Sequence, residues 1–198
     1  MKKHLLQALF CFFISGNIIA QPGVNNLNFD SWATDPLLGI FLGSLPVGMV
    51  GLQAAENTSD PQGGSGSALK LTTATVQGQN GPQDVGGICF NGQIIDLFAN
   101  DIEQGEPYTQ KPVSLDGFVK YNLLAQDTGL VLVTLTKWNG TQQEVVGIGS
   151  ADFGGSQANW TAISVPITYL SPDNPDSVAV IFTSTGVGIF QDVNGNPV

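Results

Sequence analysis

Arginine is missing from this 198-residue chain, and histidine occurs only once, as His4. The two cysteines are Cys11 and Cys89, and no apolar run reaches the roughly 18 residues that a membrane-spanning helix needs. With histidine confined to the extreme N-terminus, the body of the chain cannot build a Ser-His-Asp or Cys-His site or a His-ligated zinc site. An arginine clamp on phosphate is excluded as well.

The first 20 residues have the layout of a secretory signal. Lys2, Lys3 and His4 form a basic start, residues 5–15 are apolar, and Ile18-Ile19-Ala20 precedes an expected cut before Gln21. We therefore expect a signal peptide over 1–20 and one exported domain over 21–198, either secreted or on the cell surface. Cys89 is then the only thiol of the mature chain, which excludes an intramolecular disulfide.

The mature chain is strongly acidic. It has four lysines against 16 carboxylates, a net charge of −12. Because phosphate groups are bound by clustered Lys and Arg, nucleic acid and anionic membrane surfaces are poor partners for this chain.

Period-two alternation of β-branched and aromatic residues predicts strands along the chain. Pro166 inside one of these segments places that strand at an edge or at a bulge. Asn139-Gly140 between two apolar runs predicts a hairpin, Asn91-Gly92 is a second candidate, and Asn194-Gly195 is a third. The segments that we expect to be strands are 24–32, 68–74, 118–124, 130–138, 141–149, 160–169 and 177–184.

No stretch of 12 or more residues keeps a helical period. The fold class is therefore all-β, and a two-sheet antiparallel β-sandwich of jelly-roll type is favoured over a closed barrel. Segments 56–67, 77–87 and 100–112 are rich in turn-forming or acidic residues and are expected to be loops. Long loops of a compact β domain often carry its binding residues.

Several short motifs, taken in order, resemble the putative carbohydrate metabolism domain (PCMD) family of exported Bacteroidetes proteins. The resemblance covers roughly residues 25–190 and implies a jelly-roll sandwich like those of carbohydrate-binding modules, with no established catalytic residues. Family members continue past Asn194-Gly195 into a final strand, so the resemblance leaves open that this chain lacks that strand. The motifs are Asn26 to Trp32, Pro107 to Pro112, Leu115 to Tyr121, Leu135 to Asn139, Trp160 with Pro166 to Tyr169, and Pro175-Asp176.

Aromatic side chains are the first candidates for a glycan site, because sugar rings stack on Trp and Tyr while their hydroxyls bond to polar groups. Trp138 lies beside the Asn139-Gly140 turn, where a side chain is expected to be partly exposed. Ligand contact and hairpin packing are equally supported roles for it. Tyr108 lies in a polar loop and is expected to be exposed, with stapling of that loop to the sheet as the alternative. Trp32 is a further candidate, whereas Trp160 is expected in the core.

Carboxylate pairs would be needed for glycoside hydrolysis, since no histidine is available for acid–base work. Besides Glu56 at the start of segment 56–67, the glutamates of the mature chain are Glu103, Glu106 and Glu144. Glu103 and Glu106 are best explained as a solvated acidic turn, and Glu144 as a polar residue of an alternating strand. The sequence therefore favours a protein that is not an enzyme.

Calcium is a possible cofactor, because oxygen ligands are abundant and exported sandwiches often use the ion to pin loops. Asp30 is the candidate ligand, at a place where jelly-roll modules commonly supply one. No cofactor is required by any motif in the sequence.

Taken together, these patterns favour a non-catalytic glycan-binding module of an exported or cell-surface bacterial protein, with polysaccharide as its partner. Trp138, Tyr108, Asn139 and Trp32 are the candidate ligand contacts. Two alternatives stay open: a structural or adhesive module that contacts envelope proteins, and, with less support, a glycosidase or lyase.

Overall fold

The computed structural model describes residues 7–13, 24, 26–34, 44–46, 49–52, 55–58, 60–78, 81–96, 101–123 and 127–185. Strands predominate in these ranges, one short 3-10 turn (η1) covers Gln62–Gly64, and no α-helix occurs within them. The prediction of an all-β fold is confirmed.

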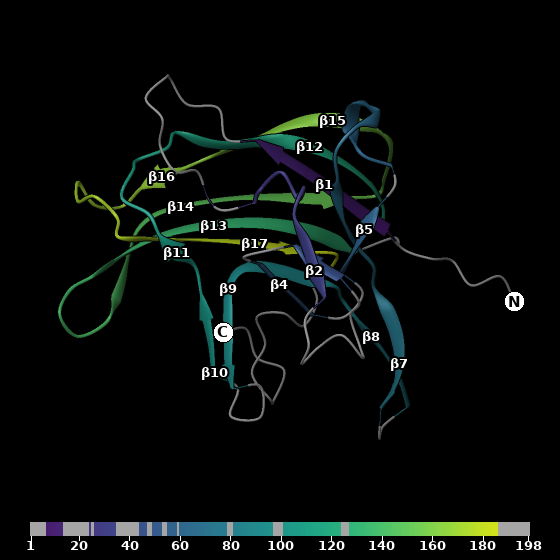
Figure 1. Cartoon of the computed structure of the whole chain (residues 1–198), viewed down its shortest axis with the longest axis horizontal. Helices are drawn as coiled ribbons and strands as arrows, with labels where there is room; N and C mark the ends of the chain where they lie inside the picture. Colours follow the sequence, from purple (N-terminus) through teal and green to yellow (C-terminus); the bar gives the residue numbers. More distant parts are fainter. Residues whose placement is uncertain are drawn as a thin grey trace, which may run out of the picture.

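The larger sheet contains eight strands, and every pairing within it is antiparallel (Figure 1). Two of its strands lie off the main path, since β11 (Glu106–Pro107) pairs with β17 and β4 (Met49–Leu52) pairs with β9. The main path runs through β10 (Asp101–Gln104), β9 (Ile88–Asp96), β17 (Ser177–Thr183), β13 (Thr128–Trp138), β14 (Gln143–Gly154) and β16 (Thr168–Tyr169).

The smaller sheet is also antiparallel and has β15 at one edge. Pro166 is the last residue of that edge strand, as predicted, because proline cannot donate to a sheet ladder. In spatial order its strands are β15 (Ser156–Pro166), β12 (Ser114–Asn122), β1 (Gln7–Phe13), β6 (Ala68–Leu71) and β5 (Ala55–Thr58). Two separate hairpin-like pairs are formed by β2 (Trp32–Thr34) with β3 (Ser44–Pro46) and by β7 (Ala74–Gly78) with β8 (Gly81–Val85).

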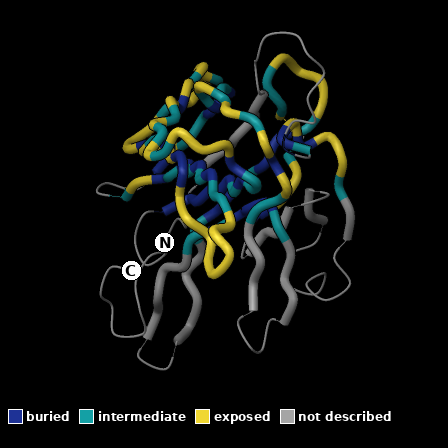
Figure 2. The backbone as a smooth tube through the Cα atoms, turned by 90° about the vertical axis from the view of Figure 1, so that its left-hand side faces the viewer, coloured by how far each residue is buried: buried dark blue, intermediate teal, exposed yellow. Residues whose placement is uncertain are grey.

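The core lies between these two sheets. In Figure 2 the buried positions, in dark blue, lie in the middle of the molecule. Leu69 and Val119 of the smaller sheet belong to the same buried cluster as Val133 and Val180 of the larger one. Phe29 meets Phe182 edge to face, with ring centroids 5.7 Å apart. The predicted antiparallel β-sandwich is therefore confirmed.

Strand β13 illustrates how the sequence produces this packing. Its residues alternate strictly between buried Val131, Val133 and Leu135 and the less buried positions between them. Because successive strand side chains point to opposite faces, one face of β13 enters the core and the other does not. The predicted strands at 130–138, 141–149 and 177–184 are confirmed by β13, β14 and β17.

The hairpin predicted at Asn139-Gly140 is confirmed, but its loop has four residues, 139–142, rather than two. Gly140 has a φ of +100°, whereas Asn139 does not have a positive φ. The Asn139 side-chain oxygen instead accepts the backbone N–H groups of Thr141 (2.8 Å) and Gln142 (2.9 Å). This side chain therefore closes the longer turn.

Three local predictions are wrong. Segment 24–32 is not a strand: Asn26 and Phe29 have positive φ, residues 26–28 form a turn, and strand structure begins only at Trp32. Asn91-Gly92 lies inside β9 instead of forming a hairpin. Parts of the predicted loops 77–87 and 100–112 belong to strands, namely β7, β8, β10 and β11. Asn194-Gly195 lies outside the described residues.

Strand β1 lies within the segment that the sequence predicts to be a secretory signal. It is paired on one side with β12 and on the other with β6. The signal peptide, its removal before Gln21 and the domain boundary there stay predictions.

Asn91 joins two partners of strand β17. Strand β9 pairs with β17 from Ile88 to Phe90, and β11 takes over at Val178. Between these two pairings, the side-chain amide of Asn91 takes the place of a backbone partner for β17. Its Nδ2 donates to the Val178 carbonyl (2.9 Å), and its Oδ1 accepts the Val180 N–H (2.6 Å). The Asn91 carbonyl accepts the Gly105 N–H (2.6 Å), which brings the β11 segment alongside.

Replacing Asn91 by alanine should leave the Val178 carbonyl and the Val180 N–H buried without these partners. We expect a loss of about 2–5 kcal/mol in the free energy of unfolding, measured by urea denaturation. Asn57→Ala in exposed β5 is the matched control and should shift the midpoint little. Equal midpoints for the two variants would contradict the role given to Asn91.

Tyr169 closes the opposite edge of the larger sheet. Its hydroxyl donates to the Pro112 carbonyl (2.9 Å), and the Lys111 ammonium lies 4.8 Å from its ring centroid. Burial, and next the neighbouring Tyr108, raise the pKa of Tyr169 from 10 to about 12.

A phenol whose pKa is raised in the folded state stabilises the fold below its unfolded pKa, and this contribution disappears as the pH rises through the folded pKa. The free energy of unfolding should therefore fall between pH 10 and about 12. Tyr169→Phe should make this decline shallower, which urea titrations across that pH range would measure. An unchanged slope in the variant would count against Tyr169 as the titrating group.

Candidate functional site

Four polar or aromatic side chains share one face of the larger sheet where β13, β14 and β17 meet. Thr136 is paired with Ser177, and Trp138 is paired with Gln143. Thr136 and Trp138 are two residues apart on β13, so their side chains point to the same face. This face is opposite to the one that carries Val133 and Leu135 into the core.

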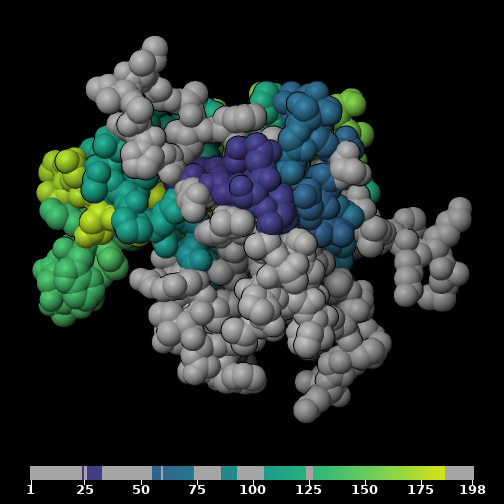
Figure 3. Space-filling model, in the orientation of Figure 1, coloured from purple at the N-terminus to yellow at the C-terminus, as the bar shows by residue number. Residues whose placement is uncertain are grey.

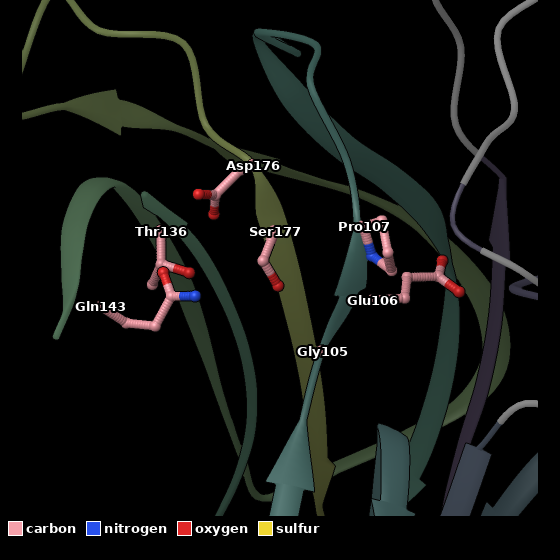
Figure 4. Close-up of a pocket in the computed structure, with 7 residues that line it drawn as sticks. All are labelled: Gly105, Glu106, Pro107, Thr136, Gln143, Asp176 and Ser177. Carbon is pink, nitrogen blue, oxygen red and sulfur yellow. The ribbon is translucent and has the colours of Figure 1, made fainter. Parts of the chain in front are cut away.

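The β11 segment borders this face and completes a hollow of about 310 Å³ (Figure 4). Its volume is at the lower end of the range for small-molecule sites, about 300–1,000 Å³. The lining residues are Gly105, Glu106, Pro107, Thr136, Gln143, Asp176 and Ser177. We call this hollow together with Trp138 the β13–β17 site.

Gly105 allows the β11 segment to approach β17 closely. Its φ is +95°, and a Cβ at this position would come within 2.9 Å of Ser177 Oγ and of the Val178 carbonyl oxygen. Only glycine accepts both the backbone conformation and the contact.

Asp176 connects the three segments that surround the hollow. Its N–H donates to the Thr136 carbonyl (2.8 Å), and its carbonyl accepts the Tyr108 N–H (2.9 Å). Its carboxylate Oδ2 accepts the Trp138 N–H (2.7 Å). Strands β13 and β17 and the segment after β11 are thus held together through one residue.

The second carboxylate oxygen of Asp176, Oδ1, is buried and has no hydrogen-bond partner among the described residues. A buried acceptor without a donor costs free energy, so a donor that enters the hollow gains by meeting it. Figure 4 shows the Asp176 carboxylate on the same side as Thr136 and Gln143. Ligand hydroxyl groups are suitable donors.

Trp138 is the most exposed aromatic side chain in the described part of the chain, with 52% of its surface accessible. It stands at the closed end of the β13–β14 hairpin, next to the loop 139–142; this hairpin is the green lobe at the left of Figure 3. The predicted exposure of Trp138 is confirmed, while its contact with a ligand stays a prediction.

Asn139 lies next to Trp138, as its sequence position requires, but its amide is already engaged. The oxygen closes the hairpin turn, and Nδ2 donates to Glu144. Asn139 therefore shapes the loop that carries Trp138.

The expected exposure of Tyr108 is wrong. Only 6% of this residue is accessible, and it belongs to the core cluster between the sheets. Burial raises its pKa. Apolar residues from both sheets surround the ring, so Tyr108 anchors the segment after β11 to the sandwich. This is the stapling role that the sequence left open as the alternative.

Trp32 is not among the residues that line the hollow. Its ring is partly buried against the core cluster, and its indole N–H donates to the Phe29 carbonyl. Trp160 is also partly buried, with the Lys120 ammonium 5.2 Å from its ring centroid. The described aromatics therefore form no multi-ring platform, and Trp138 is the exposed ring.

Asp30, the candidate calcium ligand, is exposed at the turn before β2. One of its oxygens accepts the Ser67 N–H (3.1 Å), and the other accepts the Asn28 side-chain amide (2.8 Å). No group of three or more His, Cys, Asp or Glu side chains gathers anywhere in the described ranges. Calcium binding at Asp30 stays a prediction.

Glu106 and Asp176 line the same hollow, so they are the carboxylate pair that a glycoside hydrolase would use here. Figure 4 shows the two carboxylates on opposite sides, with Glu106 directed away from the Asp176 side. Glu144 lies on the hairpin and is bonded to Asn139. The site therefore has hydrogen-bond acceptors on one side of the hollow. The carboxylates of Glu106, Asp176 and Glu144 do not form a facing pair.

Sequence reasoning missed Asp176, Thr136, Gln143 and Ser177 as members of the site. The alternation of β13 places Thr136 with Trp138, and the hairpin places Gln143 opposite Trp138, so these two were within reach of the sequence. Asp176 follows a proline and precedes a strand, a position that gives no sign of its contact with residues 38 positions earlier.

Comparisons with known proteins found no matching family model and no matching curated protein. The resemblance to the PCMD family therefore stays a prediction. A solved structure described as a putative glycoside hydrolase from Bacteroides thetaiotaomicron matches with a TM-score of 0.49 and 17% sequence identity. The match covers 67% of this chain and 50% of that protein, so the matched part is half of that protein's length. Among the described residues, no helix has the length and apolar character needed to cross a membrane.

Replacing Asp176 by alanine should free the Trp138 N–H and loosen the closed end of the hairpin. We expect faster hydrogen exchange at the Trp138 amide and a loss of about 1–3 kcal/mol in the free energy of unfolding, because the lost hydrogen bond has a charged acceptor. Asp173→Ala is the matched control, since the Asp173 carboxylate forms an exposed ion pair with Lys137 (3.1 Å). Equal exchange in both variants would contradict the role of Asp176.

Proposed function

We propose that this chain is a non-catalytic glycan-binding module of an exported or cell-surface bacterial protein. The observation that carries the proposal is the position of Trp138, an exposed indole beside a polar hollow on the same sheet face. Sugars combine apolar ring faces with hydroxyl groups, so they fit an aromatic surface flanked by acceptors and donors.

Each part of the β13–β17 site has a place in this binding mode. The Trp138 indole stacks on a sugar ring face, while Asp176 Oδ1 accepts a sugar hydroxyl in the hollow. Thr136, Ser177 and Gln143 line the same hollow and can both donate and accept.

The charge of the site narrows the ligand class. Both ionisable residues that line the hollow, Asp176 and Glu106, are acidic. The mature chain has a net charge of −12. Acidic sugars such as uronates would be repelled, so neutral polysaccharides are the proposed ligands.

Two other functions compete with glycan binding. A protein-contacting envelope module is supported by exposed apolar side chains outside the hollow, namely Val113 (78% accessible) and Leu170 (63% accessible). A glycosidase is supported only by the presence of two carboxylates in one hollow, and their opposite directions weigh against it.

The test is a screen of the mature chain, residues 21–198, against neutral and acidic polysaccharides, with and without calcium, beside a reducing-sugar release assay. Trp138→Ala should weaken binding by about tenfold or more, roughly 1.4 kcal/mol, and leave the melting temperature within a few degrees. Val113→Ala is the matched control, because it also shortens an exposed apolar side chain and lies outside the hollow.

The outcomes separate the three functions. Binding without sugar release, lost in Trp138→Ala and kept in Val113→Ala, supports the glycan module. Sugar release would establish a hydrolase or lyase instead. Absence of both from a folded protein would favour the envelope module, and loss of folding in Trp138→Ala would show that the indole is structural.

A further inference from the structure

The exposed face that carries Trp138 continues onto strand β14, on the side of β13 away from β17. Val145 is paired with Thr136, and Ile148 is paired with Thr134. Thr134, Thr136 and Trp138 are two residues apart on β13, so they share one face of the sheet. Val145 and Ile148 are both exposed large apolar side chains. We call Trp138, Val145 and Ile148 the β14 strip.

A β-bulge puts the two β14 members of the strip on the same face. They are three positions apart, so in a regular strand they would point to opposite faces. Leu135 is paired with Gly147, whereas Thr136 is paired with Val145, which leaves Val146 as one extra residue in β14. A bulge of this kind re-aims the side chains beside it. Val146 enters the core, and the apolar residues on both sides of the bulge face outward.

Hydroxyl side chains flank the strip. Ile148 lies between Thr134 on β13 and Thr168 on β16. Val145 lies beside Thr136, which also lines the polar hollow. None of these five residues is charged. A sugar ring has apolar faces and hydroxyl groups around its edge, so it matches alternating apolar and hydroxyl side chains better than a protein partner does, because the core of a protein interface is more uniformly apolar.

The strip has a defined length. Trp138 and Thr134 mark its two ends on β13, and four residues of strand span about 13 Å. Beyond Thr134 the outer face is occupied by a second buried cluster, in which Leu132 packs against Phe90 and Ile181. The open strip is therefore longer than one sugar ring, and it accommodates several linked units.

We propose that the β14 strip binds an extended neutral glycan whose chain runs along β14, with successive ring faces on Trp138, Val145 and Ile148. This inference rests on the proposed glycan-binding function and adds the form of the chain. Contacts in one row on a sheet face require successive ring faces to lie in line. Equatorially linked chains, such as cello- and manno-oligosaccharides, are ribbons that meet this requirement, whereas malto-oligosaccharides coil.

Calorimetric titration of the full chain with these three oligosaccharide series tests the form of the ligand. For a ribbon-like series we expect the affinity to rise about tenfold or more from disaccharide to tetrasaccharide and then to level off, because the strip is then filled. Equal affinity for both lengths, or equal binding of the malto series, would overturn the inference.

The same titrations separate this inference from the proposed function. Binding of another neutral glycan, with neither ribbon-like series bound, would refute the assigned chain form and leave the glycan-binding function standing. Absence of binding to every glycan by the folded protein would refute both, and the strip would then be a protein contact.

Shortening the β14 side chains tests the assigned contacts. Val145→Ala combined with Ile148→Ala should lower the tetrasaccharide affinity about tenfold, because apolar contact area is lost, and should leave the disaccharide affinity within about twofold. Trp138→Ala should weaken binding of both lengths. Val113→Ala is the matched control, since it shortens an exposed apolar side chain that precedes β12.

The melting temperature of each variant establishes that it is folded. The two single variants allow the same comparison with a smaller change to the strand. A tetrasaccharide affinity that is unchanged in the folded variants, or lost equally with the disaccharide affinity, would refute the role given to Val145 and Ile148.

Discussion

The side-chain amide of Asn91 is the interaction on which the candidate site depends. Strand β17 loses its partner β9 after Phe90, and the Asn91 amide supplies the donor and the acceptor that the ladder needs next. The Asn91 carbonyl also binds Gly105, so the β11 segment takes over the pairing at the correct distance. The Val178 carbonyl and the Val180 N–H therefore keep hydrogen-bond partners where β17 changes from β9 to β11.

Asp176 fixes the β13–β14 hairpin to this part of the sheet through hydrogen bonds. Its backbone binds Thr136 and Tyr108, and its carboxylate binds the Trp138 N–H. The exposed indole is thus anchored through the same residue that offers a buried acceptor to the hollow. A rigid base for an exposed aromatic ring reduces the entropy that ligand binding would cost, which is the physical advantage of building the site on paired strands instead of on a long loop.

The smaller sheet shows a different dependence, because its interior strand comes from the segment predicted to be removed on export. Its neighbours β12 and β6 contribute Val119, Leu69 and Leu71 to the common core. The two sheets of the sandwich therefore differ in which part of the chain supplies their strands. The larger sheet, which carries the candidate site, is built from strands of the predicted mature chain, whereas the smaller sheet takes a central strand from the predicted signal peptide.

Local patterns in the sequence were sufficient to determine the all-β class, strands β13, β14 and β17, and the exposure of Trp138 beside its hairpin, because alternation and turn chemistry act over a few residues. Only the tertiary structure decided that Tyr108 is buried, that Asn91 continues a strand ladder, that Asn26 and Phe29 form a turn, and that Asp176 meets Trp138. Each of these depends on partners far away in the chain. The pattern around one residue holds no information about which distant strand will cover it or bind its polar groups, and that choice is made when the sheets pair and pack.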